Sequence, residues 1–118
     1  MRISSLQSGL SLVREALIDT GTQLTLFDDS LARDLGIDLA DALTENVSGL
    51  GGLVREVRLA NVELRLLDRP ELSMNIEVGF APNIERSLGN LIGLDALEGF
   101  DFALSHARRT GYLSRTTR

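Results

Sequence analysis

The stretch LSMNIEVGF, residues 72–80, alternates apolar and polar side chains along its whole length. Its apolar residues, which would share one face of a strand, are Leu72, Met74, Ile76, Val78 and Phe80. An alternation with a period of two predicts a β-strand that rests one face on a hydrophobic core. A second alternating run, VELRL at residues 62–66, comes before it, and the LDRPE segment between them predicts a turn centred on Arg69 and Pro70. Two strands joined by a turn are therefore the starting point of the predicted fold.

Further strands are predicted on both sides of this pair. Residues 9–19, GLSLVREALID, predict a strand, although their alternation is imperfect. Residues 100–113, FDFALSHARRTGYL, predict a hairpin whose first strand ends at Ser105 and whose turn is basic. Strands thus dominate from residue 9 to residue 113.

Helical signals are few and short. In DDSLARDLGI, Asp28 or Asp29 can cap a helix of about two turns that Gly36 stops. A second short helix fits LDALEG, beginning near Gly93 and ending at Gly99. We therefore expect an all-β fold with two short helices.

Length and composition limit the possible classes of protein. The 118 residues predict a single domain over residues 1–118, with its core at about 10–113 and frayed polar termini. The net charge of −5 argues against nucleic acid as a partner. The absence of cysteine excludes disulfides and thiolate metal sites, and the single histidine, His106, argues against a histidine metal site or a Ser-His-Asp triad. We expect no metal, no cofactor and no membrane association, and without a signal peptide the expected location is cytoplasmic.

One short motif carries the chemistry. Residues 17–21, LIDTG, place Asp19 directly after two apolar residues and before a small-residue turn. A carboxylate in an apolar run is costly unless it has a partner or a task. The motif resembles the active-site motif of aspartic proteases. Three further segments are similar to those of retroviral-type (retropepsin-like) members in the same order: the glycine-rich VSGLGGLV at 47–54, NLIGLDAL at 90–97, and the hairpin at 100–113.

The resemblance implies a retropepsin-like closed barrel, equivalent to half of a pepsin-like enzyme. Because this chain holds only one Asp-Thr-Gly, the resemblance implies a homodimer that cleaves peptide or protein substrates with one Asp19 from each subunit. Two neighbouring carboxylates share one proton, so that the pair can activate a water and protonate the scissile carbonyl. It also implies a direct role near the site for Thr20, Gly21 and Thr22.

The resemblance assigns roles to further residues. A flap, the hairpin tip that closes over substrate, would comprise Gly49, Leu50, Gly51 and Gly52. The hydrophobic-hydrophobic-Gly motif Leu91, Ile92 and Gly93 would pack beneath the active-site loop. We interpret four aliphatic residues as walls of the substrate subsites: Leu24, Leu50, Leu53 and Ile92.

The chain departs from the family pattern at several positions. Thr22 stands where Ala or Ser is usual, and Gln23 and Leu94 stand where many viral members have an Asp–Arg ion pair. The active-site support must therefore differ from the viral pattern. Asp95 remains, and it could cap the short helix that follows.

The motif allows three other interpretations. An isolated Asp-Thr-Gly is often only a turn with an Asx-type hydrogen bond. An early Asp-x-Gly-Thr also occurs in the actin- and sugar-kinase-like phosphotransferases, but that fold needs two large lobes, for which 118 residues are too few. The third alternative is a retropepsin-like dimerisation or peptide-binding module with weak or absent catalysis.

Overall fold

The computed structural model describes residues 1–50, 53–82, 84 and 89–116. Its longest strands are β6 (Leu53–Arg65) and β7 (Ser73–Ala81), which pair antiparallel from Arg65 opposite Ser73 to Arg58 opposite Phe80. The turn between them is closed by the Leu72 N–H, which donates to the Arg69 carbonyl at 2.8 Å. Both alternating runs and the turn are thus confirmed, and β6 starts well before the predicted run.

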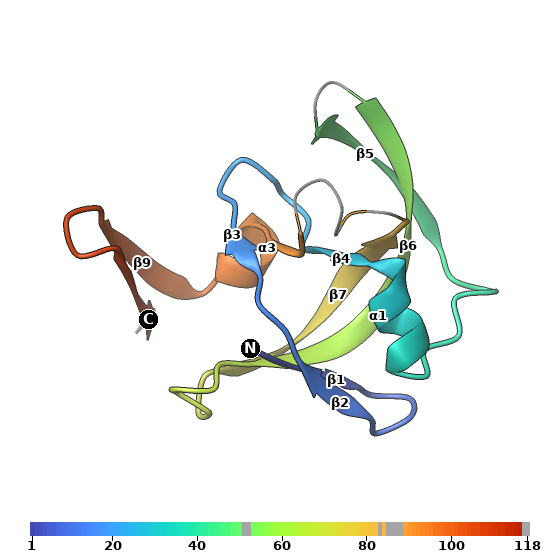
Figure 1. Cartoon of the computed structure of the whole chain (residues 1–118), viewed down its shortest axis with the longest axis horizontal. Helices are drawn as coiled ribbons and strands as arrows, with labels where there is room; N and C mark the ends of the chain where they lie inside the picture. Colours follow the sequence, from blue (N-terminus) through green and yellow to red (C-terminus); the bar gives the residue numbers. More distant parts are fainter. Residues whose placement is uncertain (51–52, 83, 85–88, 117–118) are drawn as a thin grey trace.

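These two strands form the middle of one mixed sheet with the order β2-β1-β6-β7-β4-β8-β3. An eighth strand, β5, is not part of this order and pairs with β6. The remaining strands are short: β1 (Arg2–Ser5), β2 (Ser11–Val13), β3 (Leu17–Ile18), β4 (Leu26–Asp28), β5 (Thr44–Leu50) and β8 (Leu91–Ile92). β9 (Phe100–Ser105) and β10 (Thr110–Arg115) form a separate two-stranded sheet, which projects from the body of the molecule in Figure 1. The all-β class is therefore confirmed.

The curvature of this sheet agrees with the expected barrel-type all-β fold. The sheet curls into a half-barrel, and its two terminal strands, β2 and β3, do not pair with each other. Both strands have only two or three residues.

The N-terminal segment differs from its prediction in two ways. Residues 9–19 form two strands instead of one. The first, β2, pairs antiparallel with β1, whereas the second, β3, pairs parallel with β8. The first residues, expected to be frayed, form β1, which lies between β2 and β6. Ile3 on this strand is fully buried. Its burial ties the start of the chain to the core.

Both predicted helices are confirmed. α1 (Asp29–Asp34) begins after Asp28, whose carboxylate accepts from the Ser30 N–H, and Gly36 follows it with φ +66°. α3 (Leu94–Leu97) begins after Gly93. Among the described residues, no helix is long and apolar enough to cross a membrane.

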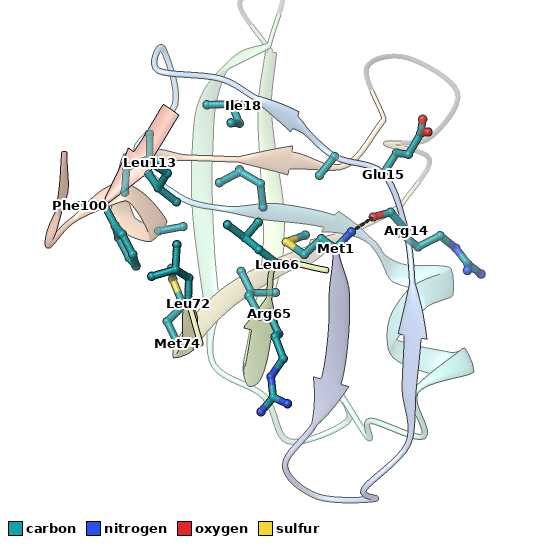
Figure 2. Close-up of a pocket in the computed structure, with 15 residues that line it drawn as sticks. Met1, Arg14, Glu15, Ile18, Arg65, Leu66, Leu72, Met74, Phe100 and Leu113 are labelled. Carbon is teal, nitrogen blue, oxygen red and sulfur yellow. Dashed lines mark hydrogen bonds between the residues drawn. The ribbon is translucent and has the colours of Figure 1, made fainter. Parts of the chain in front are cut away.

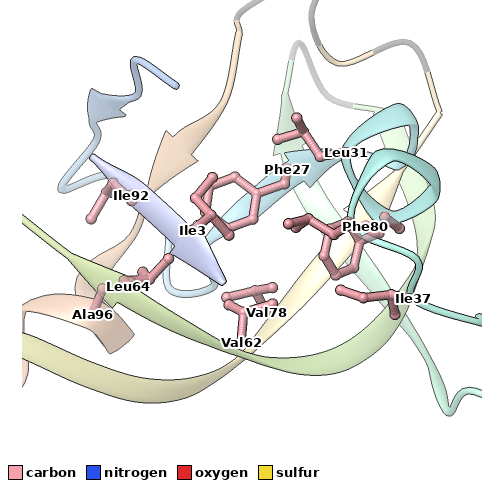
Figure 3. Packing of buried hydrophobic residues seen from close by; sticks show 12 residues of the cluster. Ile3, Phe27, Leu31, Ile37, Val62, Leu64, Val78, Phe80, Ile92 and Ala96 are labelled. Carbon is pink, nitrogen blue, oxygen red and sulfur yellow. The ribbon is translucent and has the colours of Figure 1, made fainter. Parts of the chain in front are cut away.

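The core is almost entirely aliphatic and fills the hollow of the curled sheet (Figure 3). Its two aromatic members, Phe27 on β4 and Phe80 on β7, pack with ring centroids 6.1 Å apart. The main cluster comprises Ile3, Phe27, Leu31, Ala32, Leu35, Ile37, Val62, Leu64, Val78, Phe80, Ile92 and Ala96. A smaller cluster of Leu26, Val57, Ala81, Ile84 and Leu91 continues it.

Candidate active site

The parallel pair of β3 and β8 holds the Asp-Thr-Gly motif against the Leu-Ile-Gly motif. Leu17 lies opposite Leu91 and Ile18 opposite Ile92. The next residue, Asp19, donates its N–H to the Ile92 carbonyl at 2.9 Å. Two motifs more than 70 residues apart in the sequence therefore meet at one point, where the carboxylate leaves the sheet.

A tight turn then orients the Asp19 side chain. The Gly21 N–H donates to Asp19 Oδ1 at 2.9 Å, and the Thr22 N–H donates to the Asp19 carbonyl at 3.3 Å. A Cβ on Gly21 would lie only 3.1 Å from Asp19 Oδ1. Glycine thus lets the backbone approach the carboxylate closely. The hydrogen bond to Oδ1 fixes the orientation of the Asp19 carboxylate, and Oδ2 accepts no hydrogen bond from any described residue.

The single chain leaves this motif at its surface. Asp19 is only half-buried, and its apolar neighbours Leu17 and Ile18 are 58% and 45% exposed. The sequence suggested a buried carboxylate, and one chain by itself does not bury it. The adjacent Thr20 side chain is exposed as well.

The loop after the motif, residues 22–24, rests on the start of α3. The Leu94 N–H donates to the Thr22 carbonyl at 2.9 Å, and the Asp95 N–H donates to the Gln23 carbonyl at 3.0 Å. A Cβ on Gly93 would lie 2.8 Å from the Leu24 carbonyl carbon and 3.0 Å from the Thr22 oxygen. Only glycine allows this contact, because the atoms that it would displace belong to the backbone.

Asp95 does not cap α3, contrary to the sequence prediction. The N-cap residue is Gly93, and no side chain supplies a capping bond there. The Asp95 carboxylate instead accepts from the N–H of Thr25, at 3.0 Å, and from its hydroxyl, at 2.7 Å, as well as from the Ala96 N–H. Although it is not the N-cap residue, Asp95 thus accepts from one N–H in the first turn of α3 and joins this turn to Thr25.

Thr25 is a supporting residue that sequence reasoning missed. It is fully buried, and its hydroxyl donates to Asp95 while accepting from the Gly93 N–H at 3.1 Å. This bridge ties β4 to the β8–α3 junction beside the active-site loop. Gln23 and Leu94 carry no charge, and backbone bonds together with the Thr25–Asp95 pair support this loop. The available signal was a lone polar residue in the apolar run Leu24–Phe27.

Asn90 is a second residue that the sequence did not reveal. It is buried, and its side-chain oxygen accepts from the Asp28 N–H at 3.1 Å. Its own carbonyl accepts from the Leu17 N–H at 2.8 Å, directly before the motif. Asn90 therefore links β4 to the segment that carries Asp19.

The predicted flap falls on the β5–β6 hairpin. Gly49 and Leu50 lie in β5, Leu53 begins β6, and Gly51 and Gly52 lie outside the described residues. In Figure 1 this hairpin and the loop from β3 to β4 both rise at the top of the view. The two strands on which a flap would depend, β5 and β6, are therefore present, and the flap itself stays a prediction.

The other residues predicted for the subsites lie at different depths. Leu24 is half-buried and packs against the smaller cluster of the core. Ile92 belongs to the main cluster and is 9% exposed, which favours a structural role. Their roles as subsite walls stay predictions.

An apolar cavity of about 400 Å³ lies next to β3 (Figure 2). Ile18 lines it from β3, Ile92 from β8 and Met74 from β7, and the β9–β10 hairpin contributes Phe100 and Leu113. Asp19 does not line this cavity. In the described part of the chain, no group of three or more His, Cys, Asp or Glu side chains could hold a metal ion.

Comparisons with known proteins agree with this geometry. A family model described as aspartyl protease matches residues 8–96, which include the Asp19 turn, the β5–β6 hairpin and the Leu91–Gly93 motif. No curated protein and no solved structure matches the chain.

Proposed function

The chain belongs to the aspartyl protease family, and we propose that it is an endopeptidase that works as a homodimer with one Asp19 from each subunit. The observation that carries this proposal is the Asp19 turn. Its carboxylate is oriented by the Gly21 N–H, anchored through the backbone to Ile92, and only half-buried. Such a group is held rigidly and can still reach a reactant.

The chemistry needs a second carboxylate. In an aspartic protease one ionised and one protonated carboxyl group share a proton, because two close negative charges repel each other. The ionised member takes a proton from a water, whose oxygen attacks the scissile carbonyl carbon while the other member protonates the carbonyl oxygen. The carboxyl group that took the proton from water then gives it to the leaving nitrogen as the C–N bond breaks, and the other, now ionised, takes a proton from a hydroxyl of the intermediate as the product carboxylic acid forms.

A second copy of the chain is the simplest source of that carboxylate. The sequence contains a single Asp-Thr-Gly. The exposed side chains of Leu17 and Ile18 beside Asp19 give a second copy an apolar surface to cover. Twofold symmetry would bring each Asp19 close to its equivalent. Thr20, which is exposed in one chain, would then face the partner subunit.

The surrounding elements have roles consistent with this proposal. The β5–β6 hairpin, with Gly49 and Leu50, would close over an extended peptide and exclude water. Leu24, Leu50 and Leu53 would contact apolar substrate side chains. The rigid platform below is the Leu91–Gly93 segment with its Thr25–Asp95 bridge.

The test is cleavage of a peptide library by wild-type protein and by Asp19→Asn, from mildly acidic to neutral pH. We expect Asp19→Asn to lower kcat by at least about 10²-fold, since acid–base catalysis contributes on that scale. Asp41→Asn, an exposed carboxylate in a turn away from the motif, is the matched control and should cleave like the wild type. Equal cleavage by Asp19→Asn and wild type would contradict the catalytic assignment.

Two further measurements distinguish an enzyme from a binding module. A statine-type mimic of the tetrahedral intermediate should inhibit the wild type much more strongly than a matched substrate analogue. Excess Asp19→Asn chain, mixed with wild type and allowed to exchange, should reduce cleavage, because mixed dimers hold only one intact carboxylate. Peptide binding without cleavage by the wild type would favour the non-catalytic module instead.

A further inference from the structure

The charges of this chain are divided unevenly between its last segment and the rest. All 17 acidic residues lie at or before Asp101, whereas residues 102–118 hold four of the 12 arginines. The formal charge is therefore −9 for residues 1–101, which hold eight arginines and all 17 acidic residues, and +4 for residues 102–118. A basic segment at the end of an acidic chain is typical of a contact with an acidic partner.

Most of this segment is the β9–β10 hairpin, which is fixed at its base. Its strands pair from Phe100 opposite Arg115 to Ser105 opposite Thr110. The Arg115 guanidinium carbon lies 5.4 Å from the centroid of the Phe100 ring, and Arg115 donates to the Ser73 carbonyl at 3.0 Å, which ties the base to β7. In Figure 1 the hairpin projects on the side of β3 and α3. Each strand has six residues, so the turn stands about 17 Å from the base, at about 3.3 Å per residue.

The turn at the tip, residues 106–109, presents two arginines in a defined conformation. Ser105 Oγ accepts from the Arg108 N–H at 3.3 Å, and the Thr110 hydroxyl donates to the Arg108 carbonyl at 3.0 Å. Arg109 has φ +50°, a left-handed conformation that no other non-glycine residue adopts in the described part of the chain. Arg108 and Arg109 are exposed, and neither forms an ion pair with a described residue. Both guanidinium groups are therefore available to an anion.

A hollow of about 280 Å³ lies beside this turn. It is smaller than the cavities of about 300–1,000 Å³ that hold drug-sized ligands, so its size suits a single amino-acid side chain. Arg109 contributes a guanidinium group, and Ser105 and Thr110 contribute hydroxyl groups. Guanidinium and hydroxyl donors match the acceptor oxygens of a carboxylate. The full lining is Leu104, Ser105, His106, Arg109, Thr110 and Gly111.

The base of the hairpin adjoins the candidate active site. Phe100 and Leu113 line the apolar cavity that Ile18 also lines, and Ile18 directly precedes Asp19. An extended peptide advances about 3.3 Å per residue, so a segment at the turn would lie about six or more residues from the bond cleaved at Asp19. The 17 Å length of the hairpin, itself an estimate of about that size, exceeds the Debye length of about 8 Å at physiological ionic strength. The negative charge of the body is therefore largely screened at the turn.

We propose that the β9–β10 turn binds an acidic segment of the substrate protein, apart from the residues that contact the catalytic centre. The inference rests on the proposed function, because it names the class of protein that the peptidase cleaves: one with a cluster of Asp or Glu a short distance from the cleavage site. Arg108 and Arg109 pair with the carboxylates of this cluster. Leu104, which is exposed beside the hollow, contacts the apolar parts of the same segment.

Two other anionic partners fit these observations less well. Anionic membranes are recognised by clusters of about four to eight Lys or Arg, whereas this turn holds Arg108 and Arg109. A nucleic acid is bound through phosphate contacts along an extended basic surface, whereas residues 1–101 have a formal charge of −9. A short acidic segment of a peptide needs only the turn itself.

The decisive experiment compares two peptides that share one cleavable sequence and differ only in a tail. After a Gly/Ser spacer of about six residues, one tail carries a run of Glu and the other a run of Gln, and each tail is tried on both sides of the cleavable sequence. We expect the wild type to have a kcat/KM about three- to tenfold higher for the Glu peptide, the scale of two exposed ion pairs. High salt should remove this preference.

Two double variants test whether the turn causes the preference. Arg108→Gln/Arg109→Asn removes both cations, and Asn tolerates the left-handed conformation of residue 109. Arg2→Gln/Arg33→Gln is the matched control, because it removes two exposed arginines of β1 and α1 and changes the net charge equally. We expect the first variant to lose the preference and the control to keep it, with circular dichroism to check that both are folded. A turn variant that keeps the preference, or a wild type without one, would overturn the inference and leave the proposed function standing.

A binding measurement makes the result independent of cleavage. Fluorescence anisotropy of the labelled tails with Asp19→Asn protein should show tighter binding of the Glu tail, and adding Arg108→Gln/Arg109→Asn should remove the difference. Tighter binding of the Glu tail by a protein whose wild type cleaves nothing would overturn the proposed function and support the acidic docking site. Equal binding of both tails, together with binding to phosphatidylserine vesicles or to single-stranded RNA that the turn variant loses, would assign the turn to another partner and overturn the inference.

Discussion

Replacing Thr25 by valine tests whether the buried bridge to Asp95 holds the active-site loop. Valine keeps the shape of threonine but removes the hydroxyl, which donates to Asp95 Oδ1 at 2.7 Å and accepts from the Gly93 N–H at 3.1 Å. Thr25 is fully buried, so water does not replace either partner. The substitution therefore leaves the Gly93 N–H without an acceptor and removes one donor from a carboxylate.

The expected cost follows from these two losses. A hydrogen bond to a charged group contributes about 1.5–3 kcal/mol, and an unsatisfied buried N–H costs about 1–3 kcal/mol. Because the two bonds share one hydroxyl, we expect about 3–5 kcal/mol less free energy of unfolding. For a domain of this size about 4 °C is lost per kcal/mol, so the Tm should fall by about 12–20 °C.

Urea unfolding of Thr25→Val and Thr25→Ser, followed by circular dichroism, measures this difference. Thr25→Ser keeps both hydrogen bonds and loses one methyl group, so it should cost about 1 kcal/mol. Peptide cleavage at a temperature where both variants are folded should be at least about tenfold slower for Thr25→Val, because Asp19 would lose its support. A valine variant as stable as the serine variant would refute the reasoning.

Three other outcomes are expected. Gly93→Ala should lose about 1–3 kcal/mol of stability and most activity, because the added Cβ meets backbone atoms. In Gly79→Ala the added Cβ meets only side-chain methyl groups, so thermal unfolding should show a smaller loss of stability. Asp28→Ala should lose about 2–3 kcal/mol, since its buried carboxylate caps α1 and accepts from the Ile84 N–H, whereas the exposed Asp38→Ala should lose under about 1 kcal/mol. Gly51→Val, at the proposed flap tip, should lower kcat more than Tm in paired kinetic and melting measurements; the reverse would argue against a flap.

The sequence predicted the elements that local chemistry defines. The alternation at 72–80 and the Asp28 cap depend on neighbouring residues alone, and both are confirmed. The motif at Asp19 was also visible, because its residues are adjacent in the chain. Local patterns therefore predicted the strands, the helices and the position of the candidate site.

What the sequence did not predict depends on distant partners. Residues 2–5 look polar, and only their pairing with β2 and β6 makes them a central strand. Thr25 and Asn90 gain their roles from residues 62 to 70 positions away. Such contacts follow from the tertiary arrangement and leave little trace in a local pattern.

The parallel pairing of β3 with β8 also bears on when the Asp19 turn can form during synthesis. Asp19 is anchored by residues 91–92, and its loop is supported by a bond that spans 70 positions of the chain. Contacts between such distant segments form late, because a long loop must close first. During synthesis, the early part of the chain emerges with Asp19 but without the strand that orients it. A nascent chain therefore cannot assemble the Asp19 turn before residues 91–95 have been made.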